Sequence, residues 1–295
     1  MADLVYQQSV TVLLFTRAFS PLYRRLCLNL AREVASYLYQ IYLLPSCHSQ
    51  SIRVYDLEKS TCKDMSLGFS VQYCDVNCAL DWKTILYLSP RSPSCKIDLI
   101  SGKKTPIAAM ALPRENPGAI CVYKTVYVFG GKASDFLTFS EKYLLDQDLW
   151  QPLPPLPTPK YAFNPCHYQR DIYLPEVNNS LHSFHIFHIA KDSYQTIPFK
   201  VTNNLNGCVS FIVGEELIML TISEKFTINE NCVRWNLQTM EVVRVSAKDL
   251  RKPDNAYSSC SPLVYRGLAY WVNYNNGHRL VFDPQSLSLR DLNLA

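Results

Sequence analysis

The stretch VYVFGG, residues 126–131, is a short apolar run that ends in two successive glycines. The run has the length and the residue types of a β-strand. The chain has only 9 glycines among its 295 residues. Two glycines in succession therefore raise the question of what the backbone must do at the end of this strand.

Similar apolar runs recur along the chain at intervals of about 45 residues. Each run has a large residue near its middle. The matching positions are Tyr42, Tyr87, Tyr127, Tyr173, Ile218 and Tyr270. A second series lies between them, in which an apolar run, a polar turn and another short run follow one another. Aligned at the turn, its positions are Asp56, Asp98, Asp146, Ala190, Asn236 and Asp283.

The second series is typical of β-hairpins, because Asp or Asn at a strand end can bond to its own backbone and start a turn. The first series supplies further pairs of runs, for example around Tyr123-Lys124 and Gly214-Glu215. Each period therefore holds four short strands, and the chain holds six periods.

Six periods of four strands predict an all-β fold, a six-bladed β-propeller. The competing fold is a β-sandwich, which has no reason to repeat a four-strand unit six times. We expect the propeller to span residues 40–295. The expected blades are about 40–66, 67–110, 111–156, 157–200, 201–248 and 249–295.

The third period resembles a kelch repeat. VYVFGG resembles the strand that ends in a double glycine in that family, and EKYLLDQDLWQPLPPLPTPKYAF resembles the segment that follows it. Tyr143 and Trp150 match the aromatic pair of the repeat. The resemblance implies that the two glycines turn the backbone in positive φ and pack closely. It also implies that the aromatic residues cover the core between neighbouring blades, and that the protein is a binding scaffold.

Only residues 126–163 carry this motif well; the other periods have lost the glycines. YLLP, YLSP, YLPE and MLTI stand where the third period has VFGG. Trp150 has one candidate counterpart, Tyr194. The repeats are thus degenerate, and the resemblance names no partner.

Residues 1–39 form the expected N-terminal helical segment, with a helix over 20–39. Ser20 can cap this helix and Pro21 suits its first position. Its apolar stripe either packs on the propeller or docks on another protein. An F-box would need several helices, and one is evident. The innermost strand of the first blade would have to come from about 34–39, so a three-stranded first blade remains open.

Composition narrows the classes of function. A net charge of +4 gives no reason to expect nucleic-acid binding. No apolar run approaches the ~20 residues that span a membrane, and the first residues do not read as a secretory signal. Eleven cysteines, an odd number placed mostly within apolar runs, are typical of a reducing compartment, so we expect a cytoplasmic protein.

The histidine and cysteine motifs of the sequence do not predict a catalytic or metal-binding site. His182, His185 and His188 lie three apart on a predicted strand, where side chains alternate and cannot converge on a metal. Cys74 and Cys78 form a lone CxxxC. Cys166-His167 would face opposite sides of a strand, unlike a catalytic pair. We therefore expect no catalytic, cofactor-binding or metal residues and no cofactor.

The proline-rich stretch 151–159 has two interpretations. It is an inter-blade connection in the kelch pattern, or a polyproline II ligand for an SH3-like partner.

The preferred function is a non-catalytic protein–protein interaction scaffold, monomeric, with another protein as partner. Candidate binding loops are 132–140, 246–259 and 273–278. One alternative is a substrate-recognition adaptor of a ubiquitin ligase, which would recruit the ligase through the N-terminal helix. A galactose-oxidase-like copper enzyme is the second, and it would need Tyr, His and Cys to converge at the central axis.

Overall fold

The computed structural model of the chain is built from β-strands. It describes residues 40–43, 51–56, 61–66, 75–81, 84–135, 137–160, 163–175, 183–198, 207–222, 228–246, 263–265, 267–272 and 279–291. In these ranges every regular element is a strand. The helix expected over 20–39 lies outside the described residues, as do 247–259 and 273–278 of the candidate loops. No helix in the described part of the chain has the length and apolarity that crossing a membrane requires.

The strands form six antiparallel sheets that are consecutive in the sequence. Sheet 1 comprises β1 (Gln40–Leu43), β2 (Ser51–Asp56) and β3 (Thr61–Ser66). Sheet 2 comprises β4 (Val76–Ala79), β5 (Thr84–Leu88), β6 (Cys95–Asp98) and β7 (Lys104–Pro106). Sheet 3 comprises β8 (Gly118–Val122), β9 (Thr125–Phe129), β10 (Ser140–Leu144) and β11 (Leu149–Leu153).

The other three sheets repeat this order of four strands. Sheet 4 comprises β12 (Cys166–Tyr168), β13 (Asp171–Leu174), β14 (Ser183–His188) and β15 (Ser193–Pro198). Sheet 5 comprises β16 (Gly207–Val213), β17 (Glu216–Ile222), β18 (Ile228–Asn236) and β19 (Val242–Ser246). Sheet 6 comprises β20 (Leu263–Tyr265), β21 (Leu268–Val272), β22 (Arg279–Asp283) and β23 (Ser288–Asp291).

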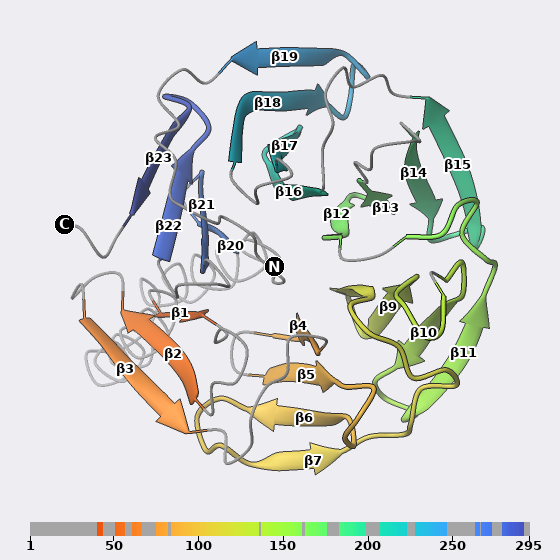
Figure 1. Cartoon of the computed structure of the whole chain (residues 1–295). Coiled ribbons are helices and arrows are strands. Elements are labelled where there is room, and N and C mark those ends of the chain that lie inside the picture. Colours follow the sequence, from red (N-terminus) through yellow and green to blue (C-terminus); the bar gives the residue numbers. More distant parts are fainter. Residues whose placement is uncertain are drawn as a thin grey trace, which may run out of the picture.

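The sheets are arranged in a ring, with the last strand of each sheet at the rim (Figure 1). This arrangement is a β-propeller, so the all-β propeller prediction is confirmed and the sandwich is excluded. The structure corrects the count of six blades to five complete four-stranded blades and one three-stranded sheet, since β1 pairs only with β2 within the described residues.

Sheets 3, 4 and 5 are buried on both faces, because each shares one hydrophobic cluster with the sheet before it and another with the sheet after it. In β9, Val126 and Val128 pack in a cluster shared with sheet 2, whereas Phe129 and Tyr127 pack in a cluster shared with sheet 4. Alternate residues of a strand point to opposite faces. The run VYVF is therefore apolar throughout because both faces of its strand are covered.

The hairpin between the third and fourth strands has a four-residue turn in the five complete blades. The fourth turn residue has positive φ in the five complete blades, at Gly102, Asp148, Asp192, Met240 and Leu287. The hairpins predicted around Tyr123-Lys124 and Gly214-Glu215 are present as two-residue turns.

The observed turns correct two positions of the predicted repeat alignment. The residue before the turn is Leu144 in sheet 3 and His188 in sheet 4, two residues before Asp146 and Ala190. A third correction concerns Tyr87, since the strand register places Leu86 at the position of Tyr127.

Candidate interaction surface

Gly130 and Gly131 end β9 in a backbone conformation that side chains resist. Their φ angles are +59° and +102°. A Cβ atom on Gly130 would lie 2.4 Å from the carbonyl oxygen of Lys160, and one on Gly131 would lie 2.9 Å from that of Glu115. The expected positive φ and close packing are both confirmed, and they explain why two glycines follow the strand.

Three connections meet at these glycines. They are 107–117, which leads from sheet 2 to β8, 130–139, which joins β9 to β10, and 154–165, which leads to sheet 4. Glu115 and Lys132 exchange both backbone hydrogen bonds, at 2.7 and 2.9 Å, and the Gly131 N–H donates to the Lys160 carbonyl at 2.8 Å. We call this end of sheet 3, formed by the described residues 107–117, 130–135, 137–139 and 154–160, the loop end.

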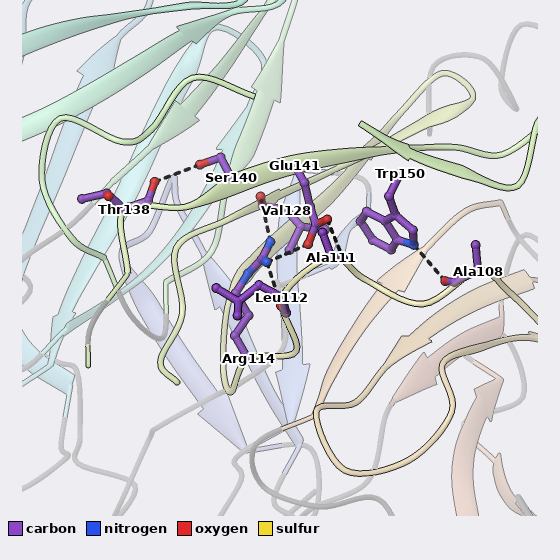
Figure 2. Close-up of polar contacts among 9 residues, drawn as sticks. All are labelled: Ala108, Ala111, Leu112, Arg114, Val128, Thr138, Ser140, Glu141 and Trp150. Atoms are coloured by element: carbon purple, nitrogen blue, oxygen red, sulfur yellow. Dashed lines mark hydrogen bonds and ion pairs between the residues drawn. The ribbon is translucent and has the colours of Figure 1, made fainter. Parts of the chain in front are cut away.

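The side chains of Arg114 and Glu141 form a buried ion pair beneath the loop end (Figure 2). The Arg114 Nη1 atom lies 2.6 Å from Glu141 Oε1, and the exposed fractions of the two side chains are 0% and 1%. Arg114 also donates to the carbonyls of Leu112 and Val128, and Glu141 accepts the N–H of Ala111. Burial lowers the pKa of Arg114, while the adjacent Glu141 carboxylate opposes this shift.

This ion pair joins two elements that are distant in sequence. Arg114 belongs to the connection that arrives from sheet 2, and Glu141 lies on β10. The guanidinium also lies 5.1 Å from the centre of the Phe139 ring. The pair therefore fixes the 107–117 connection to sheet 3 and is enclosed by protein, so its role is to hold the loops in place.

The predicted aromatic pair lies between neighbouring sheets, as expected. Tyr143 and Trp150 are opposite each other on β10 and β11, with ring centres 5.0 Å apart, and both pack in the cluster shared with sheet 2. The Trp150 indole N–H donates to the Ala108 carbonyl at 2.8 Å (Figure 2). The Ala108 N–H in turn donates to Asp148, which also accepts the hydroxyl of Tyr143.

Tyr194 is the structural counterpart of Trp150, since each pairs with an aromatic residue at the end of the third strand. It packs on Phe187 and Phe129 between sheets 3 and 4. The match suggested by the sequence is therefore confirmed.

Above this framework the loop end exposes polar and proline residues to solvent. Residues 133–135, Ala-Ser-Asp, are exposed at the tip of the 130–139 connection. Arg91 and Glu115 form an ion pair at 2.8 Å that joins connections of sheets 2 and 3. The loop end thus combines a fixed base with an exposed, polar surface.

Residues 151–153 of the proline-rich stretch belong to β11, and residues 154–159 belong to the inter-blade connection that the kelch-like pattern predicts. Leu153 and Leu156 are buried in the cluster between sheets 3 and 4, and the Leu156 N–H donates to the Thr138 carbonyl at 2.7 Å. All five prolines of this stretch are exposed: Pro152, Pro154, Pro155, Pro157 and Pro159.

The opposite end of sheet 3 consists of tight turns. The turns 123–124 and 145–148 are bound to each other through the Leu145 N–H and the Lys124 carbonyl, and an exposed ion pair joins Lys124 to Asp146. We call this the turn end of the sheet.

His185 and His188 have separate surroundings, as the alternation of a strand predicts. His185 is fully buried and lies 2.8 Å from the Thr158 hydroxyl and 3.0 Å from that of Thr196. Burial, with a contribution from Lys160, lowers its pKa to about 4. His188 instead pairs with Asp171 at 2.9 Å. His182 lies outside the described residues.

The cysteine motifs do not form a reactive centre in the described part of the chain. Cys78 is buried and free, and Cys74 lies outside the described residues. Cys166 is buried, which raises its pKa to about 12, and its thiol donates to the Asn164 carbonyl rather than to His167. Among the described residues, no three His, Cys, Asp or Glu side chains are grouped so as to hold a metal ion.

Sequence reasoning did not single out Arg114 or Glu141. A glutamate between Ser140 and Lys142 is expected to be an exposed residue of a hairpin strand. Its partner Arg114 lies 27 residues earlier, so no local pattern connects the two. The only available signal was that position 141 points to the same face as Tyr143, which the motif placed in the core.

Comparison of the sequence with protein-family models gives no match, and comparison with curated proteins gives none either.

Proposed function

We propose that this protein is a kelch-type propeller in which sheet 1 serves as the sixth blade, and that it acts as a non-catalytic scaffold for another protein. The observation that supports the function most directly is the contrast within the loop end. Its base is held by the Arg114–Glu141 pair and by backbone contacts at Gly130-Gly131. Its exposed tip at 133–135 makes few of these contacts and can vary without disturbing the strands.

A fixed loop favours recognition of a folded or extended partner, because a pre-organised surface loses little conformational entropy on binding. The partner is proposed to be a protein, since the exposed loop end carries charges of both signs and prolines. The described thiols are free, which supports a reducing, cytoplasmic location.

The test compares the same substitution at the two ends of sheet 3. Asp135→Lys changes an exposed residue of the loop end, and Asp146→Lys changes an exposed residue of the turn end. We expect the wild-type chain to retain a partner protein in stoichiometric amounts from cell extract. Asp135→Lys should reduce that recovery at least about tenfold, which corresponds to 1.4 kcal/mol of binding free energy, whereas Asp146→Lys should not.

Recovery that falls equally in both variants would contradict use of the loop end. A stoichiometric transition metal in the purified protein would contradict the non-catalytic scaffold and favour the copper-enzyme alternative. Circular dichroism of both variants serves as the control for folding.

A further inference from the structure

The inner edge of β1 is the one place where the repeat is incomplete among the described residues. The register shows which strand β1 corresponds to. Gln40 lies opposite Asp56, and four residues separate Asp56 from its partner Thr61 on β3. Thr125 lies opposite Leu144, and four residues separate Leu144 from its partner Leu149 on β11. Therefore β1 is the counterpart of β9, the second strand of its blade.

In the five complete blades a further strand precedes this one on the side of the ring centre: β4, β8, β12, β16 and β20. Figure 1 places β4, β12, β16 and β20 around the centre of the ring, and β1 lies nearer the centre than β2 and β3. The described part of sheet 1 has no such strand, so a partner for the inner edge of β1 has to come from outside the described residues.

The length of the preceding turn indicates where that partner lies. The first and second strands are joined by two residues in sheets 3, 4 and 5, at 123–124, 169–170 and 214–215. In sheet 6 the gap between Tyr265 and Leu268 is also two residues. Applied to β1, the same connection is Leu38-Tyr39, and the strand before it is Val34-Ala35-Ser36-Tyr37.

We infer that residues 34–37 of this chain dock on the inner edge of β1 as an antiparallel strand, with Tyr37 opposite Gln40 and Ala35 opposite Tyr42. The residue types agree with this register. The position next to the turn, which Tyr37 would occupy, holds Tyr168 in β12 and Tyr265 in β20. The helix expected from the sequence over 20–39 then ends before Val34.

The backbone pattern of the complete blades shows which amides would take part. In sheets 3, 4 and 5 the residue after the third strand donates to the second turn residue: Leu145 to Lys124, Ile189 to Arg170 and Leu237 to Glu215. This contact sets the alternation of backbone hydrogen bonds along β9. The N–H and C=O groups of Val126 and Val128 point to β10, so those of Thr125 and Tyr127 point to β8. By equivalence, the N–H of Tyr42 faces the position that the first strand holds in the complete blades, and the N–H of Ile41 faces β2.

The same alternation distinguishes two neighbouring residues of the docked strand. The N–H of Ala35 would point at the carbonyl of Tyr42, whereas the N–H of Ser36 would point toward the ring centre. Proline has no N–H and is tolerated in an edge strand only where that group faces away from the ladder. Ala35→Pro and Ser36→Pro are therefore matched variants that differ in one hydrogen bond to β1.

The experiment measures amide hydrogen exchange of Tyr42 and Ile41 in the full chain and in both variants. We expect the Tyr42 amide to be protected in the wild type. Ala35→Pro should accelerate its exchange at least about tenfold and lower the melting temperature. Ser36→Pro should leave the exchange close to the wild-type rate, and the Ile41 amide should stay protected in all three proteins.

Rapid exchange of the Tyr42 amide in the wild type would overturn the inference, as would equal effects of the two prolines, which a helix over 34–37 predicts. The Tyr42 amide could instead stay protected in Ala35→Pro, with a protection that increases with protein concentration. That result would show that another chain supplies the strand, and it would also overturn the inference. Deletion of residues 1–39 should destabilise sheet 1, whereas deletion of residues 1–33 should not. A test of ligase recruitment by the N-terminal segment therefore needs the shorter deletion.

Discussion

Glu141 of sheet 3 and His185 of sheet 4 occupy the same position of the repeat, two residues before the aromatic residue that pairs across the last hairpin. Both are buried, and both are held by a residue of the connection that arrives from the previous sheet. Glu141 accepts from the Arg114 guanidinium, whereas His185 contacts the hydroxyl of Thr158. One position is thus filled by an ion pair in one blade and by neutral groups in the next.

A second difference concerns Asp148 and its counterpart Asp192, because sheet 4 lacks the two groups that donate hydrogen bonds to Asp148. In sheet 3, Asp148 accepts the Tyr143 hydroxyl and the Ala108 N–H. In sheet 4, Asp192 holds the position of Asp148, but Phe187 replaces Tyr143 and Pro154 replaces Ala108 in the register. Asp192 Oδ1 is consequently buried without a hydrogen-bond partner, while its Oδ2 pairs with Lys142 at 2.9 Å.

These differences show that the repeat preserves backbone geometry more closely than polar chemistry. The four-residue turn and its last residue in positive φ are common to both sheets. The polar partners are not, because each depends on a side chain from the neighbouring blade. Single substitutions should therefore have different effects at equivalent positions.

Glu141→Gln should give the largest loss of stability, about 3–5 kcal/mol, because it leaves the Arg114 charge buried without its counter-ion. His185→Gln at the equivalent position should cost less, about 1–2 kcal/mol, since no charge is left unpaired. Urea denaturation measures both. The double variant Arg114→Met/Glu141→Leu should recover most of the loss, and a double variant as unstable as Glu141→Gln would contradict the explanation.

Gly130→Ala should cost about 3 kcal/mol, since the left-handed backbone and the contact with the Lys160 carbonyl are both penalised. Gly102→Ala is the matched control: its φ is +68° but nothing lies within 4 Å of a Cβ there. It should cost about 1 kcal/mol. Equal losses by thermal unfolding would show that the close packing at Gly130 contributes nothing.

Much of this architecture could be predicted from the sequence. Apolar runs such as VYVF predicted strands because both faces of these strands are buried, and the short polar breaks predicted the hairpins. The glycines of VFGG predicted the close approach that Gly130 makes to the Lys160 carbonyl. These features depend on residues that are adjacent in sequence.

The register and the polar contacts could not be predicted in the same way. A shift of two residues leaves every side chain on its own face, so Asp146 fitted the predicted alignment as well as Leu144 does. A shift of one residue normally exposes apolar side chains, but β5 is apolar on both faces. The sequence therefore did not distinguish Tyr87 from Leu86 as the counterpart of Tyr127. The Arg114–Glu141 pair joins a connection to a strand that lies 27 residues later, and no local sequence pattern indicates such a contact.

Acid should destabilise the protein partly through His185. Its pKa in the folded state is about 4, below the ~6.5 of an unfolded histidine. The unfolded chain therefore binds a proton that the folded chain excludes, and stability falls as the pH decreases from about 6.5 to 4, by at most about 3 kcal/mol. His185→Gln should flatten this part of the stability profile measured by urea denaturation. His188→Gln, on the same strand, is the control, and an unchanged profile in His185→Gln would contradict the assignment.

Tyr143→Phe and Phe187→Tyr exchange the aromatic residues between the two blades, and they should give the smallest effects. Tyr143→Phe removes the hydroxyl that Asp148 accepts, at a cost of about 1 kcal/mol. The pKa of Asp148, which that hydroxyl lowers more than any other group does, should rise in an NMR titration.

Phe187→Tyr should place a hydroxyl near Asp192 Oδ1, because Phe187 and Asp192 have the same spacing and turn geometry as Tyr143 and Asp148. It should raise the free energy of unfolding by up to about 1 kcal/mol; a loss instead would mean that the cluster of Phe129, Phe187 and Tyr194 has no room for the added oxygen.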